Sequence, residues 1–395
     1  MEKTTKIKQS NLIILIEACI RTIDLFLGPF LVAYFIKTSV DSMVDLSFYK
    51  ILEYSLLGLF GVLLGYIIKK NHALPVLRAG VVVRFIYILV IIFLQSDIVN
   101  HIGLIAFLHG FSAALFWLPF NIYTAKCVNN HDRTSFEVKK KIVMTSIAIL
   151  GPLLLGALIT STDFIFTAVL VSVISLVQIF LSFFLKHLPV NNTSFDMMAA
   201  IKRFRKIPQV RRIMIAGLFE GITVSGGALS ILITILIINS FKTDLNLGII
   251  NSVAAIATIV VCYLYLKFSN EKRDGFVILI SSVFPALGVL ALCLIGSEPT
   301  VIIYSILFNA FGVGLLSMIV NVRIFNSSNT LIKPEDTVEY WGLREATLNC
   351  GRIASFALMF AITIIGIEYL PVLLIFLNIF IVVLGHFAVR IKRNE

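Results

Sequence analysis

Two stretches of this chain, HGFSAALFWLPFN at residues 109–121 and NAFGVGLLSMIVN at residues 309–321, align over their full length. Phenylalanine, leucine and a final asparagine recur at the same positions, and small residues match small residues between them. A shorter match places LIE, which ends at Glu17, over LFE, which ends at Glu220. Short apolar matches also arise by chance, so a duplicated chain needs support from its overall organisation.

The composition indicates a membrane protein. The chain is 58% hydrophobic and only 14% charged, with a mean hydropathy of +0.98, whereas a soluble protein is about half apolar and about a quarter charged. The apolar residues form runs of about 20, the length that a helix needs to cross ~30 Å of hydrocarbon. A membrane β-barrel would instead show short alternating segments. We therefore expect an all-α polytopic membrane protein.

Twelve membrane spans are predicted, six on each side of a basic central linker. This organisation supports the duplication and divides the chain into a first six-helix bundle at residues 1–186, a linker at 187–212 and a second bundle at 213–395. Two parallel repeats of this kind are expected to enclose a central site. The spans cover residues 11–36, 47–68, 74–95, 99–124, 142–161, 164–186, 213–240, 246–267, 275–296, 299–324, 343–366 and 369–390.

The basic residues predict the orientation. Of 33 lysines and arginines, 27 fall in, or at the edge of, the two termini and the even-numbered connections, whereas the odd-numbered connections hold only Lys37 and Lys242. Basic loops stay in the cytoplasm, so both termini are expected there. The net charge of +11 then reflects membrane orientation and does not indicate a nucleic-acid partner. AAIKRFRKI, at 199–207, predicts a basic amphipathic helix lying at the anionic lipids of the inner leaflet.

The six-plus-six topology resembles the major facilitator superfamily of transporters over nearly the whole chain. Between the second and third spans this family often carries Gly-x-x-x-Asp-Arg-x-Gly. GYIIKKNHALPVLR keeps the glycine as Gly65 but has Lys69 where the acid would stand. The resemblance implies a small-molecule substrate, alternating access and a central cavity lined by the first and seventh spans.

Two further motifs of this family are partly present. AFLHGFSAA, at 106–114, keeps a glycine and two alanines of an exporter motif but lacks its arginine. ILGPLLLGALI, at 149–159, keeps three residues of the exporter sequence Gly-Pro-x-x-Gly-Gly, namely Gly151, Pro152 and Gly156. The resemblance implies a conformational role for these three, as a bend or a close helix contact.

The first span, LIEACIRTIDLFLGPFL at 15–31, carries three charges. The spacing i, i+4, i+7 places Glu17, Arg21 and Asp24 on one helical face. Each charge costs at least ~2.5–3.5 kcal/mol at the bilayer centre, so this face is expected to line the bundle interior as a wall of the translocation path. Asp24, near mid-membrane, is the expected proton-titrating group, with Arg21 neutralising one acid. The alternative is a buried structural network.

Other charges lie within or near the spans. Glu220, early in the seventh span, is expected either to line the cavity or to be an interfacial acid. Lys50 and Glu53 are three residues apart, which favours a local ion pair near the outer surface. Arg84 needs a partner, and both Asp24 and Glu53 qualify.

The eleventh span begins with YWGLREATLNCGRIASF at 340–356. Arg344 and Glu345 are expected at the interface, where they would gate or brace the inner side. Arg352 lies deeper and is expected either to bind an anionic substrate group or to form a salt bridge with another helix. His109 is expected to make a packing hydrogen bond, with a proton relay as the alternative.

The fourth span offers further cavity candidates. Trp117 is expected to pack against its neighbours, with stacking on a planar ligand as the alternative. Asn121 and Asn321 occupy matching repeat positions and are expected to supply hydrogen bonds near the cytoplasmic ends of their helices.

An enzyme is not expected. The six histidines are scattered without a metal-ligand pair, and neither a phosphate-binding loop nor a nucleophile motif is present. No cofactor is implied. The favoured function is proton-coupled export of a small amphipathic compound by a monomer in a bacterial plasma membrane. An uptake permease for a small polar nutrient, a lipid flippase and a non-transporting scaffold are the alternatives.

Overall fold

The computed structural model describes residues 2–39, 41–127, 130–187, 194–268 and 274–391, which are helical apart from short connections and contain no strand. The first half comprises α1 (Glu2–Leu25), η1 (Phe26–Phe30), α2 (Leu31–Thr38), α3 (Ser42–Ile67), η2 (Ile68–His72), α4 (Ala73–Leu94), η3 (Gln95–His101), α5 (Ile102–Cys127), α6 (Asn130–Ser161) and α7 (Phe164–Phe183). The second half follows α8 (Met197–Arg205) and comprises α9 (Pro208–Ile222), α10 (Ala228–Phe241), α11 (Asp244–Phe268), α12 (Asp274–Ile295), α13 (Glu298–Leu307), η4 (Phe308–Leu316), α14 (Ser317–Leu331), η5 (Pro334–Asp336), α15 (Thr337–Ile365), η6 (Ile367–Tyr369) and α16 (Leu370–Arg390).

The helices account for all twelve predicted spans. Within the described residues, nine segments are long and apolar enough to cross a membrane, and one of them, Ala73–Thr124, contains the third and fourth spans together. The first and seventh predicted spans are not among these nine segments, and α10, in the seventh, is a shorter apolar helix. The all-α membrane fold expected from composition is therefore confirmed.

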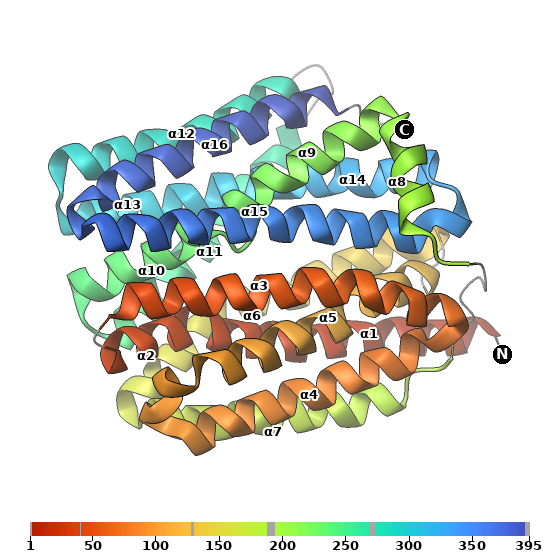
Figure 1. Cartoon of the computed structure of the whole chain (residues 1–395), viewed down its shortest axis with the longest axis horizontal. Coiled ribbons are helices and arrows are strands. Elements are labelled where there is room, and N and C mark those ends of the chain that lie inside the picture. The colour runs from red at the N-terminus through yellow and green to blue at the C-terminus, as the bar shows by residue number, and fades with distance from the viewer. Residues whose placement is uncertain (1, 40, 128–129, 188–193, 269–273, 392–395) are drawn as a thin grey trace.

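The two halves of the chain lie side by side (Figure 1). The first half, in red to yellow, faces the second half, in green to blue, and α3 packs against α15 across the boundary between them. A second contact between the halves joins α6 to α11. Both chain termini lie at the same end of the bundle, which we call the termini end. This arrangement requires an even number of spans, and the cytoplasmic location of that end remains a prediction.

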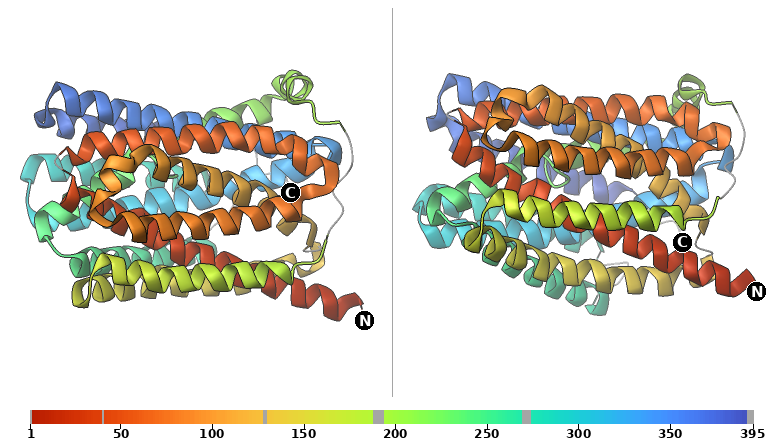
Figure 2. Two further views of the ribbon diagram at one scale, coloured as in Figure 1. Left: turned by 60° about the horizontal axis from the view of Figure 1, so that its bottom comes forward. Right: turned by 90° about the horizontal axis from the view of Figure 1, so that it is seen from below.

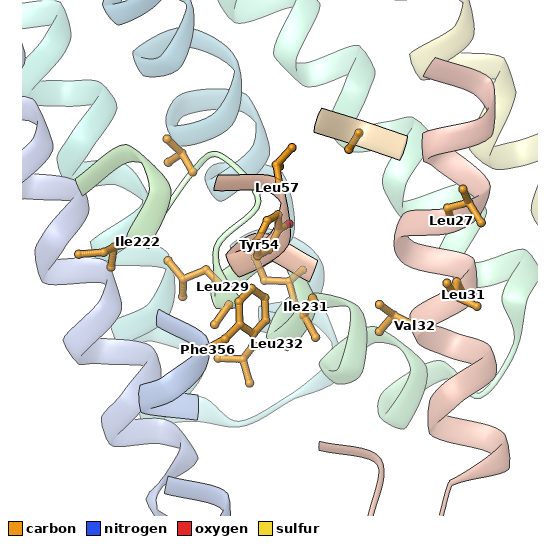
Figure 3. Close-up of a cluster of buried hydrophobic side chains, with 14 of the residues drawn as sticks. Leu27, Leu31, Val32, Tyr54, Leu57, Ile222, Leu229, Ile231, Leu232 and Phe356 are labelled. Atoms are coloured by element: carbon orange, nitrogen blue, oxygen red, sulfur yellow. The ribbon is translucent and has the colours of Figure 1, made fainter. Parts of the chain in front are cut away.

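Part of the interior at this boundary is apolar and is shared by both halves. A single cluster of buried side chains includes Tyr54 and Leu57 of α3, Leu232 of α10 and Phe356 of α15 (Figure 3). The rings of Tyr54 and Phe356 stack with their centroids 5.9 Å apart. The boundary is therefore a packed core in this structure.

The seventh predicted span, 213–240, is not continuous. It divides into α9 and α10 around residues 223–227, where Gly226 has φ +79. A positive φ is accessible to glycine without a Cβ penalty, and this explains why the small residues of GITVSGGALS permit the break. The break leaves the Ser225 carbonyl available, and Arg352 donates a hydrogen bond to it.

The linker helix α8 confirms the predicted helix but not its predicted setting. Its apolar residues Ala200 and Phe204 are buried, and the Phe204 ring lies 6.0 Å from that of Tyr340 on α15. Arg203 donates two hydrogen bonds to Asp336, which raise the pKa of its guanidinium. The helix runs across the direction of the spans at the termini end (Figure 2). Part of its apolar face therefore packs on protein, and its contact with anionic lipids stays a prediction.

Candidate functional site

A partly open pocket of about 190 Å³, called the cavity below, lies between the first and fifth predicted spans. Two charged residues and four apolar ones line it: Arg21, Asp24, Leu25, Met144, Ile147 and Ala148. The charged pair comes from α1 and the last three from α6. The sequence placed Arg21 and Asp24 on one face of the first span, and that face borders this cavity.

The three charges of the stripe have different surroundings. Glu17 is buried, and the Lys140 ammonium of α6 lies 3.4 Å from its carboxylate. Arg21 is exposed and lies 3.7 Å from Glu17, and its guanidinium stands 4.9 Å from the centre of the Trp117 ring. Trp117 thus forms a cation–π contact with a residue that lines the cavity and also packs against Phe116.

Asp24 pairs with Arg84 of α4. The Arg84 guanidinium donates a hydrogen bond of 2.7 Å to the Asp24 carboxylate, and the side chains are 1% and 30% exposed, respectively. Of the two acids that the sequence offered as partners of Arg84, the structure selects Asp24. The acid near Arg21 is Glu17, which agrees with the expectation that Arg21 neutralises one of the two acids, while a residue 60 positions away in sequence provides the counter-charge of Asp24.

A second set of interacting polar side chains is buried inside the first half. Lys50 donates a hydrogen bond of 2.7 Å to Glu53, and His109 Nδ1 lies 3.2 Å from the same carboxylate oxygen. His109 Nδ1 also lies 2.6 Å from the hydroxyl of Tyr49, which in turn lies 2.7 Å from that of Tyr87. We call these five residues the histidine cluster. All five are buried.

Two of the sequence expectations concern this cluster. The predicted Lys50–Glu53 pair forms and is buried, and its place near the outer membrane surface stays a prediction. His109 makes the expected packing hydrogen bond. Sequence reasoning missed Tyr49 and Tyr87, although a signal was available for the second: Tyr87 follows Arg84 by three residues and therefore shares its helical face.

In the second half, Glu220 pairs with Arg344 of α15 at 2.5 Å, and both side chains are buried. α15 begins at Thr337, so Arg344 lies in the third turn of a continuous helix, and its predicted place at the membrane interface stays a prediction. Glu345 is partly buried, and its backbone carbonyl accepts a hydrogen bond from Asn349. Glu220 does not line the cavity described above.

Arg352 lies where the two halves meet. It donates hydrogen bonds to the backbone carbonyl of Ser225, in the break between α9 and α10, and to the Asn349 side chain. Its guanidinium stands 4.9 Å from the Tyr54 ring of the first half. In the described part of the chain no carboxylate lies within ion-pair distance of Arg352, so the predicted salt bridge does not form there. Anion binding remains a prediction.

The partial exporter motif marks a helix contact. A Cβ on Gly156 would lie 2.6 Å from the Asp244 carbonyl of α11, and a Cβ on Gly248 would lie 2.4 Å from the Pro152 carbonyl. Gly151 faces Leu25 of α1 instead. Gly156 and Gly248 therefore let α6 and α11 approach closely across the boundary between the halves. This is the geometry that a close-packing role requires.

The two matched asparagines have different settings. Asn321 lies 3.4 Å from the Ser317 hydroxyl, which lies at the same distance from Glu220. Asn121 is partly exposed on α5. Neither is among the residues that line the cavity.

Comparison with known proteins agrees with this geometry. The family model described as Major Facilitator Superfamily matches residues 13–332. The chain is 25% identical over 334 residues to the uncharacterised protein YqgE of Bacillus subtilis strain 168, covering 83% of this chain and 76% of that protein.

Solved structures share the fold at low sequence identity. A nucleoside transporter, NupG, superposes with a TM-score of 0.68 at 15% identity, over 99% of this chain and 100% of that one. An auto-inhibited POT family peptide transporter gives a TM-score of 0.73 at 11% identity, over 98% of both chains. A bacterial homologue of the iron transporter ferroportin, in an inward-facing state, gives 0.68 at 15% identity, over 97% and 98% of the two chains.

Proposed function

This chain belongs to the Major Facilitator Superfamily and is a secondary transporter, and on that premise we propose that it exports a small amphipathic compound in exchange for protons. Membership of this family also means that it is not an enzyme. The alternating movement of the two halves around a site between them is the mechanism by which such transporters work.

The observation that carries the proposal is the mixed lining of the cavity. Leu25, Met144 and Ile147 offer an apolar wall, while Asp24 and Arg21 offer one charge of each sign. An amphipathic compound buries its apolar part against the first group and places its polar part against the second. A sugar-like nutrient would need more hydrogen-bonding groups than this lining provides.

Asp24 is the proposed coupling residue because it is shared between the cavity and a buried cation. Its carboxylate lines the cavity and accepts a hydrogen bond from Arg84, which is 1% exposed. Protonation of Asp24 removes the counter-charge of Arg84, and an unpaired buried charge is strongly unfavourable. Gain and loss of one proton therefore favour different arrangements of α1 and α4.

The cellular setting belongs to the same proposal. The basic termini and even-numbered connections support a cytoplasmic termini end in a plasma membrane, and the bacterial relative supports a bacterial source. We place the protein there as a monomer, with lipids around its exposed apolar surface.

The test is untargeted mass spectrometry of cells and medium. Strains overproducing the chain, its Asp24→Asn variant and an Asp97→Asn control are compared at two external pH values. Asp97 is an exposed acid that is not part of the cavity lining. A compound enriched in the medium by the chain and the control, but not by Asp24→Asn, supports proton-linked export. Enrichment inside the cell would favour uptake, and no enriched compound would favour lipid flipping or a scaffold role.

A further inference from the structure

The histidine cluster contains buried titratable groups that the proposed coupling at Asp24 does not use. We propose that His109 and Glu53 form a second proton-binding site, which takes up and releases one proton and passes its state to Asp24 through the two tyrosines. The binding site stands on its own geometry, and its role in coupling rests on the proposed function.

The first argument is that one nitrogen has two partners with opposite requirements. His109 Nδ1 lies 2.6 Å from the Tyr49 hydroxyl and 3.2 Å from a Glu53 carboxylate oxygen. A protonated Nδ1 donates to the carboxylate, whereas an unprotonated Nδ1 accepts from Tyr49 and then places its lone pair against the carboxylate. The same positions therefore favour a proton between His109 and Glu53 and leave a defined partner when that proton is absent.

The second argument is the balance of charge. The Glu53 oxygen that faces His109 also accepts a hydrogen bond of 2.7 Å from Lys50. One carboxylate balances one cation, so a proton on His109 adds a charge that no second acid in the cluster neutralises. Histidine ordinarily titrates near neutral pH. The proton on His109 is therefore one that the cluster can release.

The groups around the cluster fall into two sets. The charge of Arg84, on α4, interacts electrostatically with both His109 and Tyr87. The charge of its partner Asp24, on α1, interacts with Tyr87. Arg352 and Tyr54, which lie at the boundary between the halves, interact electrostatically with Lys50. The Asp24–Arg84 pair is neutral overall, so the uncompensated positive charge near the cluster comes from Arg352.

The third argument is the chain of hydroxyls. The Tyr49 and Tyr87 oxygens are 2.7 Å apart, and either one can donate. When Nδ1 is protonated, Tyr49 is free to donate to Tyr87; when it is not, Tyr49 donates to Nδ1 and accepts from Tyr87. Tyr87 stands one helical turn beyond Arg84, which holds Asp24 at 2.7 Å. The presence or absence of a proton on His109 Nδ1 thus sets the hydrogen-bond direction next to the coupling pair.

The second half has no equivalent of His109, and this provides a control. Asn309 occupies the repeat position of His109 and donates a hydrogen bond of 2.9 Å to the Ser305 carbonyl of its own helix turn. Replacement of His109 by asparagine keeps a polar atom near the position of Nδ1 but cannot bind a proton. His109→Asn is therefore the variant that removes titration with the least change of shape.

The experiment is nuclear magnetic resonance of the purified full chain, with histidine ring nitrogens labelled with ¹⁵N, between pH 5 and 9. Loss of one signal set in His109→Asn assigns His109. In the unmodified chain, the His109 signals are expected to change from the neutral to the charged form within this range. In Glu53→Gln, which lacks the carboxylate that stabilises the imidazolium, they are expected to stay in the neutral form.

Two results would overturn the proposal. One is a His109 signal that keeps a single form across the whole range, as a purely structural histidine would. The other is a titration that Glu53→Gln leaves unaltered. Asp24→Asn separates this inference from the proposed function, because the His109 titration is expected to persist in it. Absence of an exported compound would refute the export proposal while leaving the second proton site standing.

Discussion

At the scale of single residues, the sequence located the charges and the local Lys50–Glu53 pair, but it could not choose partners between helices. The i, i+4, i+7 spacing in the first span was enough to place Asp24 and Arg21 beside a cavity. It could not show that Asp24 pairs with Arg84, because that contact depends on how two helices are rotated against each other. The pairing of Arg344 with Glu220 was out of reach for the same reason.

The Asp24–Arg84 pair leads to a stability prediction. Asp24→Ala leaves the buried Arg84 without a counter-charge, and breaking a buried pair in this way costs about 3–5 kcal/mol. The melting temperature of the purified protein should fall. The double variant Asp24→Asn/Arg84→Gln removes both charges and should recover much of the loss. If Asp24→Ala has the same melting temperature as the unmodified chain, the pair is not structurally important.

At the scale of helices, glycines mark the closest contacts. Gly351 of α15 and Gly221 of α9 face each other's backbones: a Cβ on either would lie 2.0 Å from a carbonyl oxygen of the other helix. Small residues at such crossings let membrane helices approach closely. The sequence indicated the close contact of α6 through Gly-Pro, but these two positions carry no motif and emerge only from the packed structure.

We expect Gly351→Ala to destabilise the protein by about 1–3 kcal/mol, the usual cost of overpacking. Gly103→Ala is the matched control, because a Cβ at Gly103 meets nothing within 4 Å and alanine is the better helix former. Thermal unfolding of the two variants measures the difference. Equal melting temperatures would mean that α9 and α15 can separate without cost.

At the scale of the whole molecule, the two halves are joined by ion pairs at both ends. Lys69, after α3, pairs with Glu339 of α15 at the termini end, and both side chains are buried. Lys37, at the end of α2, pairs with Asp244 of α11 at the opposite end. The sequence showed Lys69 only as a departure from a family motif. Its partner lies 270 residues away, so hydropathy and local spacing could not reveal it.

Alternating access predicts opposite effects from removing these two pairs. Lys69→Gln/Glu339→Gln should favour opening at the termini end, and Lys37→Gln/Asp244→Asn should favour opening at the other end. The readout is labelling of Ala148→Cys, in a chain whose five native cysteines are replaced, by an impermeant thiol reagent applied to either face. Removal of each pair should increase labelling several-fold from its own side. A change of about 1.4 kcal/mol in the free-energy difference between the closed and open arrangements changes their population ratio about tenfold. Identical changes from both sides would contradict the two-ended arrangement.

The central claim, that Asp24 couples export to protons, has its most direct test in inside-out membrane vesicles. The compound that the chain enriches in the medium is offered outside, and its entry is followed with and without an imposed proton gradient. We predict that the gradient accelerates entry for the unmodified chain and for Asp97→Asn. Asp24→Asn should lose that acceleration while exchange of labelled for unlabelled compound remains measurable. Gradient-driven entry that survives in Asp24→Asn would contradict the claim.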